Sequence, residues 1–446
     1  MMTLQQLAEK ADLQYIGNDM TLPPINIDSR MVKSGDLFVA IVGPNFDGHH
    51  YVEQAIAQGA AAILVDHQMD ITVPQMIASD TTLALRTLAQ LWRQQFNVPL
   101  IGLTGSCGKT TTKQMLVHIV AELSPALVTQ GNYNNAIGLP LTLLGLRPEH
   151  RYAVIEMGTN GPGEIPYLAN IAKPTVSMIT NIRASHLEGL GSLAGIAQEK
   201  GAIYDHLDSH GTAIINSDEP FVTDWQARLA GQSVITFACE ADADVTAHDL
   251  SQTALHSQFV AKTPRGPLII ELPIPGQHQI SNALAAIAAA IAADIPTQAI
   301  QQGLANMQAV KGRFHPYHLQ NGALLIDDTY NASTSAVKSA IEALGQHPGK
   351  RLFVMSNMSE LGDHAAHYHQ AMGRWANEHP LDVFWLYGDE NLLQHTLQAC
   401  TTARYFADKT ELAEALRSEI TKDSMVIIKG SRANKMEDII KVIIEE

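Results

Sequence analysis

Hydrophobic and polar positions follow the rhythm of an α/β protein over most of the chain. Short runs of aliphatic and β-branched residues alternate with longer segments in which apolar residues recur every three or four positions. In residues 1–80, strands are expected at Leu37–Val42 and Ala61–Val65, on either side of a helix at His49–Gln58. This pattern predicts a small N-terminal α/β domain.

Residues 81–311 repeat this alternation on a larger scale and are expected to form a central domain. An amphipathic helix at Asp80–Phe96 comes first. The strands that follow are expected at Val98–Ile101, Tyr152–Ile155, Val176–Thr180, Thr212–Ile215 and Val234–Phe237, with a helix at Leu193–Leu207. This order predicts a mostly parallel sheet covered on both faces. Val245–Leu272 alternates like antiparallel strands, and Ser281–Ala293 returns to a helical pattern.

A third series of strands and helices fills residues 312–446. Strands are expected at Leu324–Ile326, Leu352–Met355, Val383–Leu386 and Met425–Ile428, and helices at Ala336–Leu344, Ala366–Asn377, Glu411–Glu419 and Lys435–Ile444. This series predicts a Rossmann-like, doubly wound C-terminal domain without a phosphate loop of its own. The fold class predicted for the whole chain is therefore α/β with three domains.

The strongest chemical signal is a glycine-rich turn, Gly102–Thr111, between the strand at Val98–Ile101 and a helical pattern at Lys113–Val120. Backbone N–H groups in such a turn cradle phosphates, a lysine adds positive charge, and a threonine hydroxyl can reach Mg²⁺. The strict spacing of this motif would place its first glycine at residue 103, but the glycines are Gly102 and Gly105. We predict a nucleoside triphosphate site; the alternative is a glycine-rich turn with a surface lysine.

Composition narrows the possible partners. Asp and Glu number 45 against 29 Lys and Arg, and the net charge of −16 disfavours nucleic acid as a partner. Three widely spaced cysteines form no disulfide framework. The N-terminus lacks the apolar core of a signal peptide, and Ala283–Ala293 is shorter than the roughly 20 residues of a membrane span. We expect a soluble, cytoplasmic protein with no membrane span.

Polar residues that follow the central strands are candidates for the site, because ligands collect beyond the carboxyl ends of parallel strands. Glu156 can offer oxygen to Mg²⁺, and His186 can bind metal or simply donate hydrogen bonds. Taken alone, Lys200 reads as a solvated lysine beside Glu199, and Asn282 as a polar residue at a helix start. The residues by themselves leave a hydrolase, a kinase and a ligase open.

The motifs together resemble the muramyl ligase family over essentially the whole chain. Thr104–Thr111 has the shifted phosphate loop of that family, and Asp28-Ser29-Arg30, Gly35–Ala40 and Asp47-Gly48-His49 resemble its uridine-nucleotide-binding domain. The motifs similar to those of members that add D-alanyl-D-alanine are Gly131–Asn135, Ile137–Thr142, Glu156-Met157-Gly158, Asp327–Ala332, Lys429–Arg432 and Met436-Glu437.

This resemblance implies an ATP-dependent amide ligase that joins D-alanyl-D-alanine to UDP-N-acetylmuramoyl-tripeptide through an acyl phosphate, in peptidoglycan precursor synthesis. ATP and two Mg²⁺ ions are the implied cofactors. We expect a monomer, while the residues themselves leave the oligomeric state open. Lys200 matches a lysine that CO₂ carbamylates in the family, which requires a neutral amine and hence a lowered pKa.

The resemblance also assigns roles to individual residues. The catalytic residues are Lys109, Glu156, His186 and Lys200, and the metal ligands are Thr110, Glu156, His186 and Lys200. The nucleotide-binding residues are Gly105, Ser106, Cys107, Gly108, Lys109, Thr110, Thr111, Asn282, Arg313 and Asp328. The substrate-binding residues are Ser29, Arg30, Asp47, Gly48, His49, Asn134, Asn135, Tyr330 and Asn331.

Two motifs of the C-terminal domain depart from the family pattern. Ser356–Gly362 stands where the family usually has Gly-Asp before the methionine, and Ala332-Ser333-Thr334 replaces a usual Ala-Asn-Pro. Three alternatives are a sibling amide ligase, a folylpolyglutamate-type synthetase, and a nucleotide-dependent partner without catalysis. The residues also leave open whether the third peptide residue is diaminopimelate or lysine.

Overall fold

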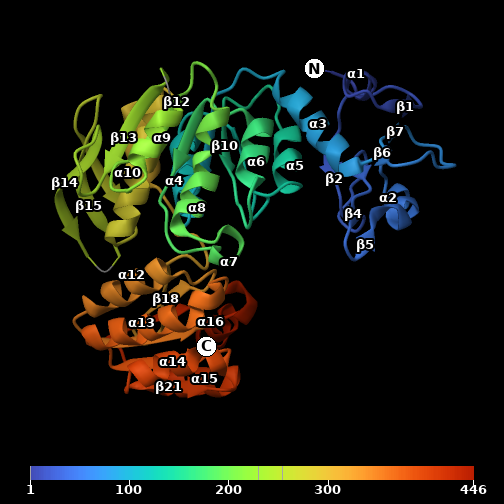
Figure 1. Cartoon of the computed structure of the whole chain (residues 1–446). Coiled ribbons are helices and arrows are strands. Elements are labelled where there is room, and N and C mark those ends of the chain that lie inside the picture. Colours follow the sequence, from blue (N-terminus) through green and yellow to red (C-terminus); the bar gives the residue numbers. More distant parts are fainter. Residues whose placement is uncertain (1, 230, 254, 446) are drawn as a thin grey trace.

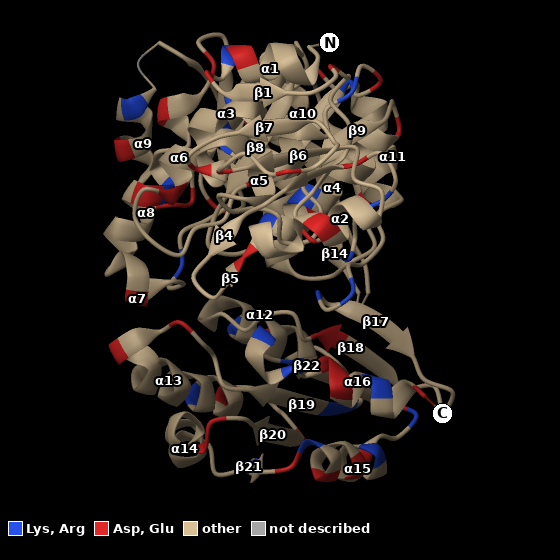
Figure 2. Cartoon of the chain, turned by 90° about the vertical axis from the view of Figure 1, so that its right-hand side faces the viewer, with Lys and Arg blue, Asp and Glu red and all other residues tan. Residues whose placement is uncertain are grey.

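The computed structural model describes residues 2–229, 231–253 and 255–445, and its strands form three main sheets. Figure 1 shows an N-terminal unit in blue beside a middle unit in cyan to yellow, with a C-terminal unit in orange and red below the middle one. Figure 2 shows acidic and basic residues interspersed over all three units. In the described residues, no helix is long and apolar enough to cross a membrane.

The N-terminal unit is a small sheet with short helices. Its strand order is β1 (Gln14–Ile16), β7 (Gln75–Ile77), β6 (Ala62–Val65), β3 (Leu37–Val39) and β2 (Ile25–Asn26), and only β1 pairs antiparallel. The other elements are α1 (Leu4–Lys10), the hairpin β4 (Val42–Gly43) and β5 (Phe46–Asp47), η1 (Gly48–Tyr51) and α2 (Val52–Ala57). The strand expected to reach Val42 ends at Val39, because the chain turns there into the hairpin.

Helix α3 (Thr81–Arg93) joins the N-terminal unit to the middle one. The Asp80 side chain accepts a hydrogen bond from the Leu83 N–H and so caps the helix start. Leu85, Leu88 and Trp92 are buried on one face, and the Trp92 indole donates to the Leu146 carbonyl at 3.1 Å. The amphipathic helix expected at Asp80–Phe96 is confirmed.

The middle sheet has the order β16 (Leu268–Leu272), β15 (Ser257–Lys262), β14 (Val245–Gln252), β13 (Ser233–Ala238), β12 (Thr212–Asn216), β11 (Val176–Ile179), β8 (Leu100–Thr104), β10 (Tyr152–Glu156) and β9 (Ala126–Val128). From β9 to β14 the neighbours pair in parallel, whereas β15 and β16 are antiparallel. Both predictions for this sheet, its parallel part and its antiparallel edge, are confirmed.

Helices cover both faces of the middle sheet. On one face lie α5 (Gly138–Leu144), α6 (Glu164–Ala172) and α8 (Leu193–Gly201), and on the other α4 (Lys109–Ala121), α10 (Gln277–Ala292) and α11 (Thr297–Ala305). The remaining helical elements are α7 (Leu187–Leu190), η2 (Tyr204–His206) and α9 (Val222–Arg228). The helix expected at Leu193–Leu207 is therefore two elements, and α10 begins four residues before the expected Ser281.

The C-terminal sheet has the order β17 (His315–His318), β18 (Leu324–Asp328), β22 (Ser424–Lys429), β19 (Lys350–Ser356), β20 (Val383–Tyr387) and β21 (Ala403–Phe406), parallel except for β17. Its helical elements are α12 (Thr334–Gly345), η3 (Gly362–His364), α13 (Ala365–Glu378), α14 (Glu390–Ala399), α15 (Lys409–Glu419), η4 (Arg432–Asn434) and α16 (Glu437–Ile444). Separate apolar cores lie on the two faces of this sheet, as a doubly wound unit requires.

Candidate active site

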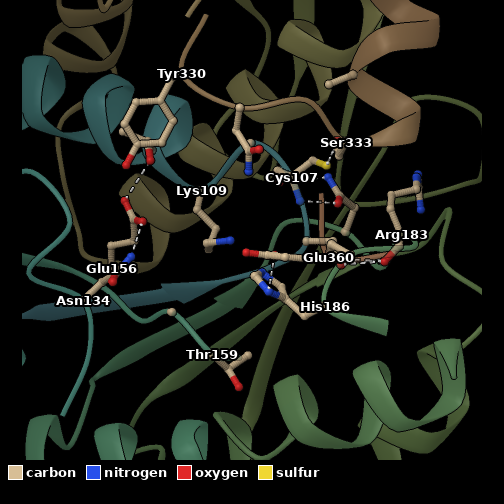
Figure 3. Close-up of a pocket in the computed structure, with 18 of the residues that line it drawn as sticks. Cys107, Lys109, Asn134, Glu156, Thr159, Arg183, His186, Tyr330, Ser333 and Glu360 are labelled. Carbon is tan, nitrogen blue, oxygen red and sulfur yellow. Dashed lines mark hydrogen bonds and ion pairs between the residues drawn. The ribbon is translucent and has the colours of Figure 1, made fainter. Parts of the chain in front are cut away.

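A cavity of about 1000 Å³ lies between the middle and C-terminal units. The turn between β8 and α4 forms one wall, the start of α10 a second, and the β18–α12 segment of the C-terminal unit a third. Figure 3 shows side chains from both units converging on this cavity. The carboxyl ends of β8, β10 and β11 all open onto it, as expected for an open parallel sheet.

The phosphate-loop turn is closed by contacts that only glycine permits. Gly105 and Gly108 have φ values of 150° and 81°. A Cβ on Gly105 would lie 1.9 Å from Thr180 Oγ1, and one on Gly108 would lie 2.2 Å from Asn282 Oδ1. Thr180 Oγ1 donates to the Cys107 carbonyl at 2.6 Å, which fixes the middle of the turn. The α4 N–H groups therefore face the cavity as a formed anion cradle.

Lys109 opens helix α4 and lines the cavity. Its Nζ donates to the Gly105 carbonyl at 2.7 Å, so the lysine folds back over its own turn. Desolvation in the cavity lowers the pKa of the Lys109 ammonium, and the nearby Glu156 carboxylate opposes this shift. The positive charge therefore lies directly above the cradle, where a phosphate would bind.

Glu156, the last residue of β10, is the centre of a polar network. Thr110 Oγ1 donates to its Oε2 at 3.1 Å, and Asn134 Nδ2 donates to its Oε1 at 2.9 Å. Lys113 Nζ lies 3.2 Å from Oε2, and both residues are buried. Burial alone would raise the pKa of Glu156, but Lys113 and Lys109 outweigh it and hold that pKa below its usual value. The carboxylate is therefore ionised at neutral pH.

His186 reaches the cavity from the loop after β11. Its φ is 55°, a left-handed conformation, and it immediately precedes α7. Its Nδ1 lies 2.8 Å from Oε2 of Glu360, which belongs to the loop between β19 and α13 in the C-terminal unit. Glu360 belongs to the Ser356–Gly362 motif, from which no role for it was predicted.

Lys200 is fully buried on α8, so its interpretation as a solvated lysine is wrong. Its Nζ is completely shielded, and no described residue offers it a hydrogen bond. Burial lowers the pKa of Lys200 far below its usual value, and repulsion from Lys109 adds to the shift. Burial therefore favours the neutral amine, which is the form that reacts with CO₂.

The C-terminal unit contributes a second group of charged residues. Arg313 Nη2 donates to Thr110 Oγ1 at 3.1 Å, and its guanidinium lies 4.2 Å from the centre of the Tyr330 ring. Asp328 Oδ2 lies 2.6 Å from Nζ of the buried Lys429. Arg313 thus connects the two units at the hydroxyl that also contacts Glu156.

The structure brings most of the predicted site residues into one cavity. Its lining includes Ser106, Cys107, Gly108, Lys109, Thr110, Thr111, Asn134, Asn135, Glu156, His186, Asn282, Arg313, Asp328, Tyr330 and Asn331. Gly105 and Lys200 lie outside the lining; Gly105 touches Lys109, whereas Lys200 is enclosed behind the cavity wall.

The five predicted residues of the N-terminal unit lie elsewhere. Ser29 Oγ donates to Gln54 at 3.0 Å, and Arg30 pairs with Asp28 at 2.7 Å. The Asp47 carboxylate accepts from the His49 N–H at 2.9 Å, and a Cβ on Gly48 would lie 2.8 Å from the Ile41 backbone. These residues do not line the cavity between the other two units.

Sequence reasoning gave no role to several charged residues of the site: Lys113, Arg183, Glu360 and Lys429. Lys113 follows Lys109 by four positions, which places both on one face of α4. Arg183 precedes His186 by three positions in the same loop after a strand. The only sign of these roles in the sequence was therefore that Lys113 and Arg183 lie within four positions of residues that had been assigned to the site.

The fold and the cavity define a three-unit protein whose phosphate loop faces a doubly wound unit across a charged site. The chain belongs to the Mur ligase family. It matches three family models: "Mur ligase family, catalytic domain" over residues 24–87, "Mur ligase middle domain" over 103–290, and "Mur ligase, glutamate ligase domain" over 312–432.

Relatives of known function and structure match over nearly the full length. The chain is 39% identical to the UDP-N-acetylmuramoyl-tripeptide–D-alanyl-D-alanine ligase of Escherichia coli, across 99% of this chain and 98% of that protein. Its structure is similar to that of MurF from Acinetobacter baumannii, with a TM-score of 0.92, 35% identity, and coverage of 100% and 99%. MurF from Thermotoga maritima in complex with ADP gives a TM-score of 0.85, 27% identity, and coverage of 95% and 98%.

Proposed function

We propose that this protein is an ATP-dependent amide ligase that joins D-alanyl-D-alanine to UDP-N-acetylmuramoyl-tripeptide and releases ADP and phosphate. The observation that carries this proposal is the cavity between the phosphate loop and the C-terminal unit, in which Lys109, Glu156 and Arg313 converge. The near full-length similarity to a ligase of that name supports the choice of substrates.

The reaction needs activation because a carboxylate is a poor electrophile with a poor leaving group. Transfer of the γ-phosphoryl group of ATP to the terminal peptide carboxylate forms an acyl phosphate. The amine of D-alanyl-D-alanine then attacks its carbonyl carbon, the amide bond forms, phosphate leaves, and the ammonium proton is lost. Lys109 and the α4 N–H groups neutralise and orient the phosphates, while Arg313 approaches from the C-terminal unit.

The residues fit the Mg²⁺ ions that the family implies. The Thr110 hydroxyl and the Glu156 carboxylate lie 3.1 Å apart. Both offer oxygen atoms, the ligands that a hard cation such as Mg²⁺ prefers. The proposed ligands are Thr110, Glu156, His186 and Lys200. The shielded, unpartnered amine of Lys200 suits a reaction in which its nitrogen bonds to the carbon of CO₂ and releases a proton, giving a carboxylate. When bound, Mg²⁺ would neutralise charge on the phosphates.

The remaining assignments follow the same proposal. Residues 1–80 would bind the uridine nucleotide through Ser29, Arg30, Asp47, Gly48 and His49. Residues 81–311 would bind ATP, with Asn282 at the adenine and Asn134 and Asn135 at the peptide. Residues 312–446 would complete both sites with Asp328, Tyr330 and Asn331. We propose that the protein works as a monomer in the cytoplasm, where ATP is available.

The proposal is tested by measuring phosphate release from ATP with UDP-N-acetylmuramoyl-tripeptide, with and without D-alanyl-D-alanine, while mass spectrometry follows the pentapeptide product. We expect release and product only when all three substrates and Mg²⁺ are present. Phosphate release that ignores the dipeptide, with no change in the mass of the uridine substrate, would refute the proposal. A uridine substrate whose peptide is one residue shorter, offered together with a free diamino acid as the amine, tests the sibling ligase that adds the third residue.

A further inference from the structure

Arg183 is a cation of the cavity wall that the mechanism above does not use. It follows β11, and both its backbone and its guanidinium are held by contacts with other residues. Its carbonyl accepts a hydrogen bond from Ser106 Oγ at 3.0 Å, which ties its backbone to the phosphate loop. Its Nη1 lies 2.6 Å from Oε1 of Glu219, whose side chain is fully buried, whereas the Arg183 side chain is 44% exposed. A rigid guanidinium is thus presented at the cavity surface.

The guanidinium retains hydrogen-bonding capacity for a ligand. Its hydrogen bonds to described residues both come from Nη1, to Glu219 and to the Ile182 carbonyl at 2.6 Å. The edge formed by Nε and Nη2 has no acceptor among the described residues. Such an edge binds a carboxylate or a phosphate through two parallel hydrogen bonds. Since Glu219 orients the group from behind, little rotamer freedom would be lost on binding.

The position of Arg183, in the loop after β11, indicates which substrate anion it can reach. β8 carries the phosphate loop, β10 with Glu156 lies on one side of it, and β11 with Arg183 lies on the other. Figure 3 shows Glu156 and Arg183 on opposite sides of Lys109 and Cys107. The N-terminal unit lies at the β9 edge, because Ile25–Ile27 line a second cavity together with Ala126–Val128. A uridine-linked peptide therefore approaches from the β10 side.

The β11 side of the cavity lies opposite the uridine-linked peptide, across the phosphate loop, and we place the amine substrate there. That side is also lined by Ser359, Glu360 and Leu361 of the C-terminal unit. An extended dipeptide spans about 7 Å, so a carboxylate held at one wall leaves its amine free to point toward the centre of the cavity. A dipeptide without side-chain charges offers only its two termini for ionic recognition, and its C-terminal carboxylate matches the open edge of Arg183.

We propose that Arg183, held by the buried Glu219, binds the C-terminal carboxylate of the incoming dipeptide and so selects the amine substrate. This inference depends on the proposed function. The ligand class is a peptide α-carboxylate, and the competing source of the same chemistry is the γ-phosphate of ATP. The two sources differ in which substrate loses affinity when the guanidinium is removed.

The test compares D-alanyl-D-alanine with its C-terminal amide, which keeps the shape but lacks the charge. For the wild type, we expect kcat/KM to be roughly tenfold to a hundredfold lower with the amide, the range for a hydrogen bond to a charged group. In Arg183→Gln, kcat/KM for the dipeptide should fall by the same factor while the value for the amide stays constant, so that the preference disappears. The loss should appear in KM for the dipeptide, with KM for ATP unchanged.

Two further variants control for folding and for general charge. Arg228→Gln removes another arginine with a 2.6 Å ion pair, to Asp205, outside the cavity lining, and should keep the wild-type preference. Arg183→Gln with Glu219→Gln removes the buried carboxylate that the single variant leaves unpaired, and should also lose the preference.

A preference for the carboxylate that persists in Arg183→Gln or in the double variant overturns the inference. So does a rise in KM for ATP with the preference intact, which would assign Arg183 to the γ-phosphate. These outcomes differ from a failure of the proposed function, in which the wild type itself forms no product from the dipeptide.

Discussion

His186 and Glu360 meet across the boundary between the middle and C-terminal units, with Nδ1 2.8 Å from Oε2. Both residues adopt left-handed backbone conformations, with φ values of 55° and 63°. Non-glycine residues in this region store strain, and the surrounding structure must hold them there. The pair therefore places a loop of the C-terminal unit against the cavity, beside Lys109, whose charge also acts on the Glu360 carboxyl.

Replacing Glu360 with alanine should slow the reaction without unfolding the protein. The carboxylate is 54% exposed, so its contact with His186 contributes at most about 1 kcal/mol to stability. Its loss would loosen the alignment of the two units, and a displacement of about 1 Å can cost up to roughly a hundredfold in rate. We expect kcat to fall roughly tenfold to a hundredfold. Glu342→Ala, which removes an exposed partner of Lys338 in the same unit, should have no effect. A wild-type rate for Glu360→Ala would contradict this reading.

Substitutions at the two buried lysines Lys113 and Lys200 should change the free energy of unfolding in opposite directions. Both are buried, but Lys113 pairs with Glu156 and donates to the Thr129 carbonyl at 3.0 Å, whereas the Lys200 amine has no partner among the described residues. In CO₂-depleted buffer, Lys200→Met should raise the free energy of unfolding by about 1–3 kcal/mol, the cost of an unsatisfied buried polar group. Lys113→Met should lower it by about 3–5 kcal/mol, because a buried carboxylate loses its cation. Chemical denaturation measures both, and a destabilised Lys200→Met variant would count against an unpartnered amine.

The advantage of Lys200→Met should depend on pH. The pKa of Lys200 lies far below its usual value in the folded protein because of burial. Between that pKa and the unfolded value of about 10.5, the unfolded chain binds one more proton than the folded chain. The free energy of unfolding of the wild type, relative to that of the variant, therefore increases as the pH rises across this window. It decreases again as the pH falls. Unfolding at about pH 7 and about pH 9 should show the variant's advantage shrinking at the higher pH; a constant difference would mean that Lys200 titrates normally.

A side chain at Gly108 should disturb the phosphate cradle. Gly108→Ala would place a Cβ 2.2 Å from Asn282 Oδ1, at a backbone φ of 81°. Gly266 has a comparable φ of 97° but faces open space, so Gly266→Ala carries the backbone strain alone. We expect Gly108→Ala to lose at least about tenfold in affinity for a non-hydrolysable ATP analogue, since a shift of the cradle misaligns several N–H donors at once. Calorimetric titration of both variants checks this, and equal affinities would show that the turn adapts.

The regular elements were largely predictable from the sequence because buried parallel strands are short apolar runs, such as Val176–Thr180. The hairpin at Val42–Asp47 was not, since its strands have two residues each and its base is closed where Gly48 approaches the Ile41 backbone. The early start of α10 was also missed, because Gln277–Ile280 has no helical periodicity of its own and is positioned by packing on α4.

The candidate site was predictable where a motif carries the chemistry, as at Gly105–Thr110. It was not predictable where the property arises from tertiary packing. The burial of Lys200 depends on how α8 covers the sheet, and its neighbours in the chain give no sign of it. Arg183 and Glu360 acquire their importance from Glu219 and His186, which lie 36 and 174 positions away in the sequence.

The central claim, activation of the peptide carboxylate by phosphorylation, is tested most directly with UDP-N-acetylmuramoyl-tripeptide labelled with ¹⁸O in its terminal carboxylate. Formation and aminolysis of an acyl phosphate transfer one carboxylate oxygen to the released phosphate. We expect one ¹⁸O atom in the phosphate for each pentapeptide formed, as measured by mass spectrometry. Product formation with unlabelled phosphate would contradict the account.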